Sequence, residues 1–151
     1  MGLDWKRDMT DQNSDQELAA ILTSTKRIAL VGASAKPDRP SYGVMQFLLR
    51  HGYEVTPVNP ALAGTQIHGR KVAATLEEAA PFDMVDLFRR PSEVLEPVRD
   101  AIRLGAKTVW MQLGVVNEDA AREARDAGLM VVMNRCPAIE MPRLGVAGPA
   151  A

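Results

Sequence analysis

The sequence predicts an α/β fold in which a doubly wound parallel sheet of about five strands is flanked by helices. Apolar runs with little alternation recur along the chain, as expected of parallel strands that are covered on both faces. Between them lie segments with apolar residues at helical spacing. Three of these segments end at a glycine that can take the left-handed conformation after a last helical turn, namely Gly52, Gly105 and Gly128. Strands that alternate with helices are typical of this fold class.

A short N-terminal helix precedes the first strand. Residues 1–13 are polar and are expected to be flexible. Ser14 and Glu17 then stand at capping-box spacing ahead of an apolar stripe in "SDQELAAIL". The first strand begins at Ile28, and the helix after it is expected to have Ser41 as its N-cap.

The later elements repeat this alternation. Strands are expected in "YEVTPVNP", "DMVDLFRRP", "KTVWMQLG" and "LMVVMNRCP". Thr75 and Glu78 form a second capping box, and Asn117 is the expected N-cap of "EDAAREARDAG". Ser92 is the expected cap of the helix between these two, where Pro97 should bend the helix or delay its start. The expected strand order is 3-2-1-4-5, with right-handed crossovers.

Bulk composition bounds the class of protein. One domain is expected over residues 14–143, followed by a disordered tail over 144–151. Lys and Arg number 18 against 19 Asp and Glu, so no global basic field indicates nucleic acid or a membrane as partner. The N-terminus lacks the apolar core of a signal peptide. Cys136 is the only cysteine, so an intrachain disulfide is excluded, and with two histidines it cannot close a zinc site without carboxylates. We expect a cytoplasmic protein without a metal centre.

The carboxyl ends of the strands are the expected place for a ligand, because open parallel sheets bind ligands where the chain reverses direction across the sheet. Here those ends read "GASAK", "VNP", "FRRP", "QLG" and "NRCP". Gly32 permits a tight turn after the first strand, and the helix near Ser41 offers N–H groups and a positive dipole end to a phosphate. In the alternative interpretation, Gly32 and Gly43 serve only tight turning and helix packing. We favour a nucleotide site.

The loop side chains narrow the ligand class. A dinucleotide fingerprint requires three glycines, but Ser34 occupies the place of the second. NAD also favours a carboxylate at the end of the second strand, where this chain has Asn59. The loops instead carry four cations, Lys36, Arg39, Arg89 and Arg90. For the last two, a solvated charged turn is the alternative. Guanidinium groups pair well with phosphate oxygens, so NADP and coenzyme A (CoA) both fit.

Four segments in this order resemble the small stand-alone CoA-binding domain proteins: "VGASAKPDRPSYGVMQFLLRHGYEVTPVNP", "VDLFRRP", "WMQLG" and "MNRCP". The resemblance covers roughly residues 25 to 143. These segments are also similar to the CoA-binding domains of the succinyl-CoA synthetase α subunit and of ADP-forming acyl-CoA synthetases. The resemblance implies a Rossmann-like fold whose ligand is CoA or an acyl-CoA.

The resemblance also implies a role for each loop. The diphosphate would meet backbone N–H groups, a hydroxyl, two cations and the helix start, provided by Gly32, Ala33, Ser34, Lys36, Arg39, Ser41, Tyr42 and Gly43. The adenosine would lie between two walls, formed by Val58, Asn59 and Pro60 and by Phe88, Arg89, Arg90 and Pro91, with an arginine reaching the ribose phosphate. Gln112 and Gly114 would follow the pantetheine path. The synthetases carry a lysine after the second strand, where this chain has Leu62.

No catalytic residue is expected. In the synthetases that the sequence resembles, the phosphorylated histidine lies in a second domain, beyond the segment that this chain matches. His51 at a helix end and His68 in a turn are expected to have structural roles. We therefore expect non-catalytic binding of CoA or acyl-CoA. The alternatives are an NADP- or other nucleotide-dependent enzyme and an interaction module that has lost its ligand.

Cys136 has two interpretations. Cysteine is among the most buried residue types, so in the first it is a small buried residue at a strand end. In the second, its place in "NRCP" near the carboxyl edge lets it meet the thiol of bound CoA and form a mixed disulfide.

Overall fold

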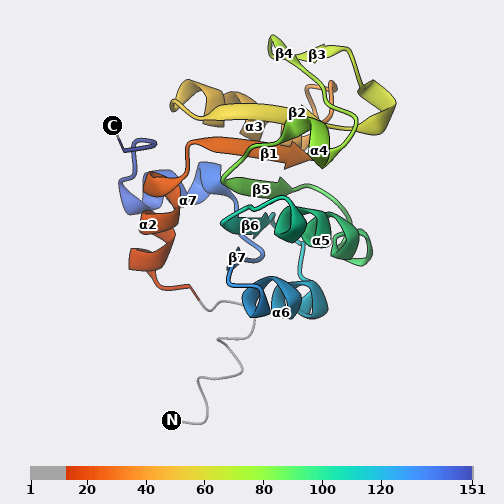
Figure 1. The fold of residues 1–151 in the computed structure, drawn as a ribbon. Coiled ribbons are helices and arrows are strands. Elements are labelled where there is room, and N and C mark those ends of the chain that lie inside the picture. Colours follow the sequence, from red (N-terminus) through yellow and green to blue (C-terminus); the bar gives the residue numbers. More distant parts are fainter. Residues whose placement is uncertain (1–12, 151) are drawn as a thin grey trace, which may run out of the picture.

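The computed structural model describes residues 13–150 and confirms the Rossmann-like α/β fold (Figure 1). Its parallel sheet consists of β1 (Arg27–Val31), β2 (Glu54–Val58), β5 (Met84–Leu87), β6 (Thr108–Met111) and β7 (Met130–Val132). Two short strands that the sequence analysis missed, β3 (Gln66–Ile67) and β4 (Arg70–Lys71), form a separate antiparallel hairpin beyond β2. The flexible segment expected over residues 1–13 lies, apart from Asn13, outside the described residues, as does Ala151.

The helices divide between the two faces of the sheet (Figure 1). One face is covered by α2 (Asp15–Ser24), α3 (Pro40–Arg50) and α7 (Pro137–Leu144). The other is covered by α4 (Leu76–Ala79), α5 (Leu95–Arg103) and α6 (Glu118–Asp126). Two short 3-10 helices, η1 (Pro60–Leu62) and η2 (Pro91–Glu93), follow β2 and β5. Alternate strand residues enter opposite cores: in β5, Met84 packs with the first group of helices, and Val85 and Leu87 pack with the second.

The strand order differs from the expected one. The sheet runs β2-β1-β5-β6-β7, which is 2-1-3-4-5 along the chain, so the expected order 3-2-1-4-5 is wrong. The physical reason lies in β2, where Pro57 has no N–H to give to an outer neighbour and therefore suits an edge strand. Its carbonyl oxygen instead accepts a hydrogen bond from the N–H of Ala73 (2.9 Å). β5 pairs with β1, so the chain changes direction across the sheet between these two strands.

Three expected helix caps are confirmed. Ser14 and Glu17 make both bonds of the capping box at α2. At α4 the Thr75 hydroxyl accepts a hydrogen bond from the N–H of Glu78, which confirms the cap but is only one of the two bonds of the expected capping box. Asn117 caps α6, and its amide N–H₂ also donates to the carbonyl oxygen of Pro91 (2.8 Å). This second bond ties the loop after β6 to the loop after β5.

Two other expected caps are wrong. The N-cap of α3 is Arg39 and not Ser41, because the helix begins at Pro40, whose missing N–H needs no partner in a first turn. Ser92 lies in η2, and α5 begins only at Leu95. Pro97 has therefore delayed the start of this helix, as the sequence predicts, and occupies its first turn.

The C-terminal tail, expected to be disordered over 144–151, is placed against the rest of the chain as far as Ala150. The N–H of Ala150 donates to the carbonyl oxygen of Thr23 (2.8 Å). A side chain at Gly148 would approach the carbonyl oxygen of His51 to 2.2 Å, so the tail passes close to the end of α3. Within residues 13–150, no helix combines the length and the apolar character that crossing a membrane requires.

Candidate functional site

A pocket of about 480 Å³ lies at the carboxyl edge of the sheet, on the face of α3 and α7. We name it the glycine-loop pocket. Eleven residues that the sequence analysis selected line it: Gly32, Ser34, Arg39, Ser41, Phe88, Arg89, Arg90, Pro91, Gln112, Gly114 and Cys136. The lining also contains four apolar residues that no sequence motif indicates, Pro40, Val44, Leu113 and Val115. The loops after β1, β5, β6 and β7 thus meet in one place, as the strand-end rule predicts.

Gly32 sits where the ends of three strands are closest. Its φ of +86° is in the left-handed region, and a Cβ there would stand 2.2 Å from the carbonyl oxygen of Phe88. The N–H groups of Gly32 and Ala33 both donate to the carbonyl oxygen of Val58, at 3.1 and 3.3 Å. The expectation that these two groups face a diphosphate therefore needs correction, because the end of β2 already uses them. Both a positive φ and close approach make glycine necessary here.

The loop beyond Gly32 presents polar groups and the start of α3. The Ser34 hydroxyl oxygen accepts a hydrogen bond from the N–H of Lys36 (3.1 Å), which leaves the hydroxyl proton for another acceptor. The first turn of α3 carries no acidic side chain, so the positive end of the helix dipole is not offset within that turn. Arg39 precedes this turn and lines the pocket. This corner can accept an anion.

Arg89 and Arg90 bring cations from the opposite side, after β5. The Cδ of Arg89 lies 3.1 Å from the position that a Cβ on Gly32 would take, so its side chain passes directly over the glycine turn. Its Nη2 stands 3.4 Å from Oε2 of Glu93. Arg90 precedes η2 and is exposed. With Arg39, three arginines therefore line this pocket.

A buried polar pair lies at the floor of the pocket, and the sequence analysis missed one of its members. Asp86 lies in the middle of the sheet with no exposed surface, and burial raises its pKa well above the usual value. With the Gln112 amide oriented so that Nε2 faces this carboxyl, Nε2 donates to Oδ1 (2.9 Å) and Oδ2 (3.2 Å). Asp86 thereby fixes the amide of a residue that lines the pocket.

The far wall is formed by Cys136, the residue that precedes α7. Its side chain is buried and its thiol is free. The neighbouring loops are tied together here, because Asn134 accepts a hydrogen bond from the N–H of Gly114 (2.7 Å) and Trp110 donates to the carbonyl oxygen of Arg135 (2.7 Å). The position satisfies both interpretations of Cys136, since the residue is buried and also borders the pocket.

A second, larger pocket of about 980 Å³ lies at the same edge on the face of α4 and α5, and we name it the adjacent pocket. Val58 and Pro60 line it, as does Arg89, which is the one residue common to both pocket linings. Asn59 lines neither. Its amide N–H₂ donates to the carbonyl oxygen of Ala33 (2.9 Å), and its Oδ1 accepts the N–H of Ala61, so it joins the loops after β1 and β2.

Four more selected residues lie outside both pockets, namely Ala33, Lys36, Tyr42 and Gly43. Ala33 is buried in the core. The carbonyl oxygen of Tyr42 faces Nε2 of His68 at 2.8 Å, and their ring centroids are 4.1 Å apart. His68 therefore holds the β3–β4 hairpin against α3, which agrees with a structural role.

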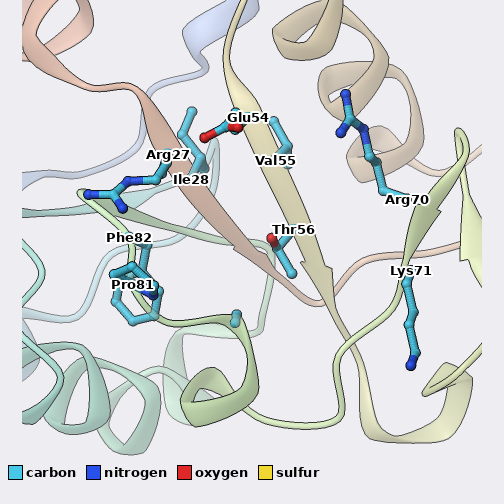
Figure 2. Close-up of a pocket in the computed structure, with 10 residues that line it drawn as sticks. Arg27, Ile28, Glu54, Val55, Thr56, Arg70, Lys71, Pro81 and Phe82 are labelled. Carbon is cyan, nitrogen blue, oxygen red and sulfur yellow. The ribbon is translucent and has the colours of Figure 1, made fainter.

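A third hollow, of about 320 Å³, lies toward the opposite edge of the sheet (Figure 2). Three cations border it, but Figure 2 shows Arg27 on one side of β2, with Arg70 and Lys71 on the other and pointing apart. Arg27 lies 3.7 Å from Asp83, which also accepts the N–H groups of Lys26 and Arg27. Burial raises the pKa of Asp83, but these N–H groups and nearby cations outweigh it and lower the pKa below the usual value. The three cations that border this hollow therefore do not point toward one common position (Figure 2).

Metal binding finds no support in residues 13–150, which contain no cluster of three or more His, Cys, Asp or Glu side chains suited to an ion.

Comparisons with known proteins agree with this geometry. The uncharacterized protein YneT of Bacillus subtilis is 36% identical over 124 residues, which are 82% of this chain and 90% of the relative. Subunit alpha of the ADP-forming acetate–CoA ligase I of Pyrococcus furiosus is 42% identical over 93 residues, 58% of this chain but only 20% of that subunit. The solved structure of a hypothetical protein from Pyrococcus horikoshii OT3 is 44% identical, with a TM-score of 0.84, covering 89% of this chain and 94% of that one.

The sequence profile of the CoA binding domain family matches residues 26–142. The matched segment starts just before β1 and ends within α7, so it includes every residue that lines the glycine-loop pocket. The chain belongs to the CoA-binding domain family.

Proposed function

We propose that this protein binds CoA or an acyl-CoA, without catalysing its turnover, in the glycine-loop pocket and the adjacent pocket. The observation that carries the proposal is that three arginines and a positive-φ glycine turn meet at the edge where the chain changes direction between β1 and β5. Open parallel sheets bind nucleotides at such a point, and guanidinium forks match phosphate oxygens. The family membership supports CoA over NADP as the ligand.

In this proposal each part of the ligand has its own surroundings. The phosphates lie near Ser34, Arg39 and Arg89, where the start of α3 adds a positive dipole. The pantetheine arm follows the largely apolar wall toward Gln112 and Cys136. Gln112 is already held by Asp86, so its amide is presented in a fixed orientation. The adenosine occupies the adjacent pocket, beside Val58 and Pro60.

The chemistry of the pocket lining supports binding without catalysis. Around the pantetheine arm of the proposed ligand, the ionisable side chains of the glycine-loop pocket are Arg39, Arg89, Arg90 and Cys136, with neither a histidine nor a carboxylate to transfer a proton at the thiol. The carboxylates of the adjacent pocket, Glu77, Glu93, Glu96 and Asp100, lie on the adenosine side of that ligand. The ligase subunit that this chain resembles is about five times longer than the matched segment, so its activity does not extend to this chain by similarity alone.

Isothermal titration tests the proposal with CoA, dephospho-CoA, NADP and ATP. We expect CoA to bind, and Arg90→Ala to weaken CoA about tenfold or more, since a charge-assisted hydrogen bond is lost. Arg122→Ala, which changes an exposed arginine on α6 outside both pockets, is the control and should leave the affinity within twofold. A larger loss for CoA than for dephospho-CoA assigns Arg90 to the ribose phosphate. Tight binding of NADP without binding of CoA would overturn the proposal.

A further inference from the structure

Arg89 makes an ion pair with a carboxylate of the protein itself. Its side chain passes over Gly32, borders both pockets and ends 3.4 Å from Oε2 of Glu93, one helical turn further along the chain. Glu93 lines the adjacent pocket. The arginine whose side chain passes over the glycine turn is therefore paired with a carboxylate of the protein itself.

A ligand phosphate that uses Arg89 must compete with this carboxylate. The ribose phosphate of CoA is a monoester with more charge than a carboxylate and three terminal oxygens, and the diphosphate carries two charges over four terminal oxygens, so either group can displace Glu93 from the guanidinium. The pair is well suited to exchange, because its side chains are 39% and 42% exposed and exposed ion pairs are weak. A buried and fully desolvated pair would resist such displacement.

We infer that Glu93 is a competing counter-anion that releases Arg89 to a ligand phosphate, and that it thereby lowers the affinity of the site for its ligand. This inference rests on the proposed function, since it names how the binding of a phosphate-bearing ligand is limited. Glu93 lowers the affinity for the ligand in two ways. The Arg89–Glu93 attraction is lost on binding, and the carboxylate freed beside the phosphate repels it. The ligand is consequently held less tightly than the three arginines alone would hold it and can exchange more readily.

The other carboxylates of the adjacent pocket differ from Glu93 in their partners. Glu77 and Asp100 both pair with Arg103, each at 3.2 Å. Glu78 on α4 is exposed, lines neither pocket and makes no ion pair with any residue in the described part of the chain, 13–150. Glu78→Gln therefore removes the same charge without touching the ligand or releasing an arginine, which makes it the control for Glu93→Gln.

Isothermal titration of the wild type and the variants with CoA and dephospho-CoA tests the inference. We expect Glu93→Gln to tighten binding about two- to fivefold, the range set by a weak exposed pair, and Glu78→Gln to change it less than 1.5-fold. If Glu93→Gln raises the affinity for CoA alone, Arg89 is assigned to the ribose phosphate. If it raises the affinity for both CoA and dephospho-CoA, Arg89 is assigned to the diphosphate. In the Arg89→Ala background the gain from Glu93→Gln should fall to that of the control. Equal gains from both glutamine variants, weaker binding by Glu93→Gln, or an undiminished gain without Arg89 would each overturn the inference.

A probe without the CoA structure separates this inference from the proposed function. Inorganic diphosphate can be titrated while the NMR signal of the Arg89 Nε–Hε group is followed in the wild type and in Glu93→Gln. A shift that saturates at lower diphosphate in Glu93→Gln supports the exchange even if CoA does not bind, in which case only the proposed function fails. Saturation at the same concentration in both proteins counts against the exchange.

Discussion

Charged side chains are arranged differently at the two edges of the same sheet. Toward the amino edge, Asp83 is matched by Arg27 and by two backbone N–H groups, and the remaining cations of the hollow point apart (Figure 2). At the carboxyl edge, three arginines line one pocket, and Asp86 is buried with an amide as its partner. Both edges are hollowed, so a cavity alone does not distinguish a site.

Backbone geometry does not separate the two edges. At the carboxyl edge, Gly32 and Asn134 have positive φ values. Toward the amino edge, Gly52, Gly105 and Gly128 have positive φ values just before β2, β6 and β7. What differs is the buried carboxyl of Asp86 with its raised pKa, a feature that functional sites concentrate.

The largest effect is expected at Gly32. The substitution Gly32→Ala places a Cβ 2.2 Å from a backbone oxygen at a φ that alanine avoids, so the ends of β1 and β5 must separate. We expect a loss of about 3–5 kcal/mol in the free energy of unfolding, or roughly 10 °C in Tm, measured by thermal denaturation. CoA binding should be lost with it.

Gly43 provides the control, because a Cβ there would meet no atom within 4 Å and the residue lies inside α3. Gly43→Ala should raise the free energy of unfolding by about 0.5–1 kcal/mol through improved helix propensity. CoA affinity should stay within twofold, since Gly43 lines neither pocket. A tenfold loss of affinity in a stable Gly43→Ala protein would instead support the prediction from the sequence that Gly43 is a ligand-contacting residue.

An intermediate effect is expected from Asp86 and Asp83, which should respond to pH with opposite sign. Burial raises the pKa of Asp86 above its unfolded value of ~3.9, so the folded state binds the proton more tightly. The favourable contribution of Asp86 to the free energy of unfolding is therefore complete below pH ~3.9 and is lost as the pH rises toward the folded pKa. The pKa of Asp83 is lowered, so its contribution is complete above ~3.9 and is lost as pH falls through the folded pKa.

Urea denaturation of Asp86→Asn and Asp83→Asn between pH 3 and pH 8 measures this difference. The wild type should lose stability relative to Asp86→Asn as pH rises above 4. Relative to Asp83→Asn it should gain stability over the lower part of the range and stay about 1–2 kcal/mol ahead at neutral pH, because charged hydrogen bonds are lost. Parallel pH profiles for the two variants would contradict the assignment of opposite surroundings to the two carboxyls.

Local signals in the sequence were sufficient for the five parallel strands, for most of the helices and for much of the pocket. The caps at Ser14, Thr75 and Asn117 depend on spacings of three residues, which a sequence displays directly. The strand-end loops met in one pocket because any parallel sheet brings them to the same edge. The proline of β2 could also have corrected the strand order, since Pro57 favours an edge position.

Features that depend on register were beyond the reach of the sequence. The N–H groups of Gly32 and Ala33 are used by Val58 only because β1 and β2 pair in one particular register. Asp86 reads as one polar residue in an apolar strand, and its partner Gln112 becomes visible only when β5 and β6 lie side by side. These pairings join segments that are distant in the chain, so no local sequence pattern predicts them.

The smallest effect is expected from the exposed cations of the amino-edge hollow. Arg70→Ala and Lys71→Ala remove charges that point apart on the β4 side of β2 (Figure 2), so CoA affinity should stay within twofold and the free energy of unfolding within about 0.5 kcal/mol. The same titration and denaturation assays measure both quantities, with Arg90→Ala as the positive control. A tenfold loss of CoA affinity for either variant would mean that cations at both edges contribute to binding, and the arrangement of the cations would then not distinguish the proposed site from the hollow. Normal CoA affinity in both variants would support the proposal that the three arginines lining one pocket, and not the number of cations at an edge, determine where the phosphates bind.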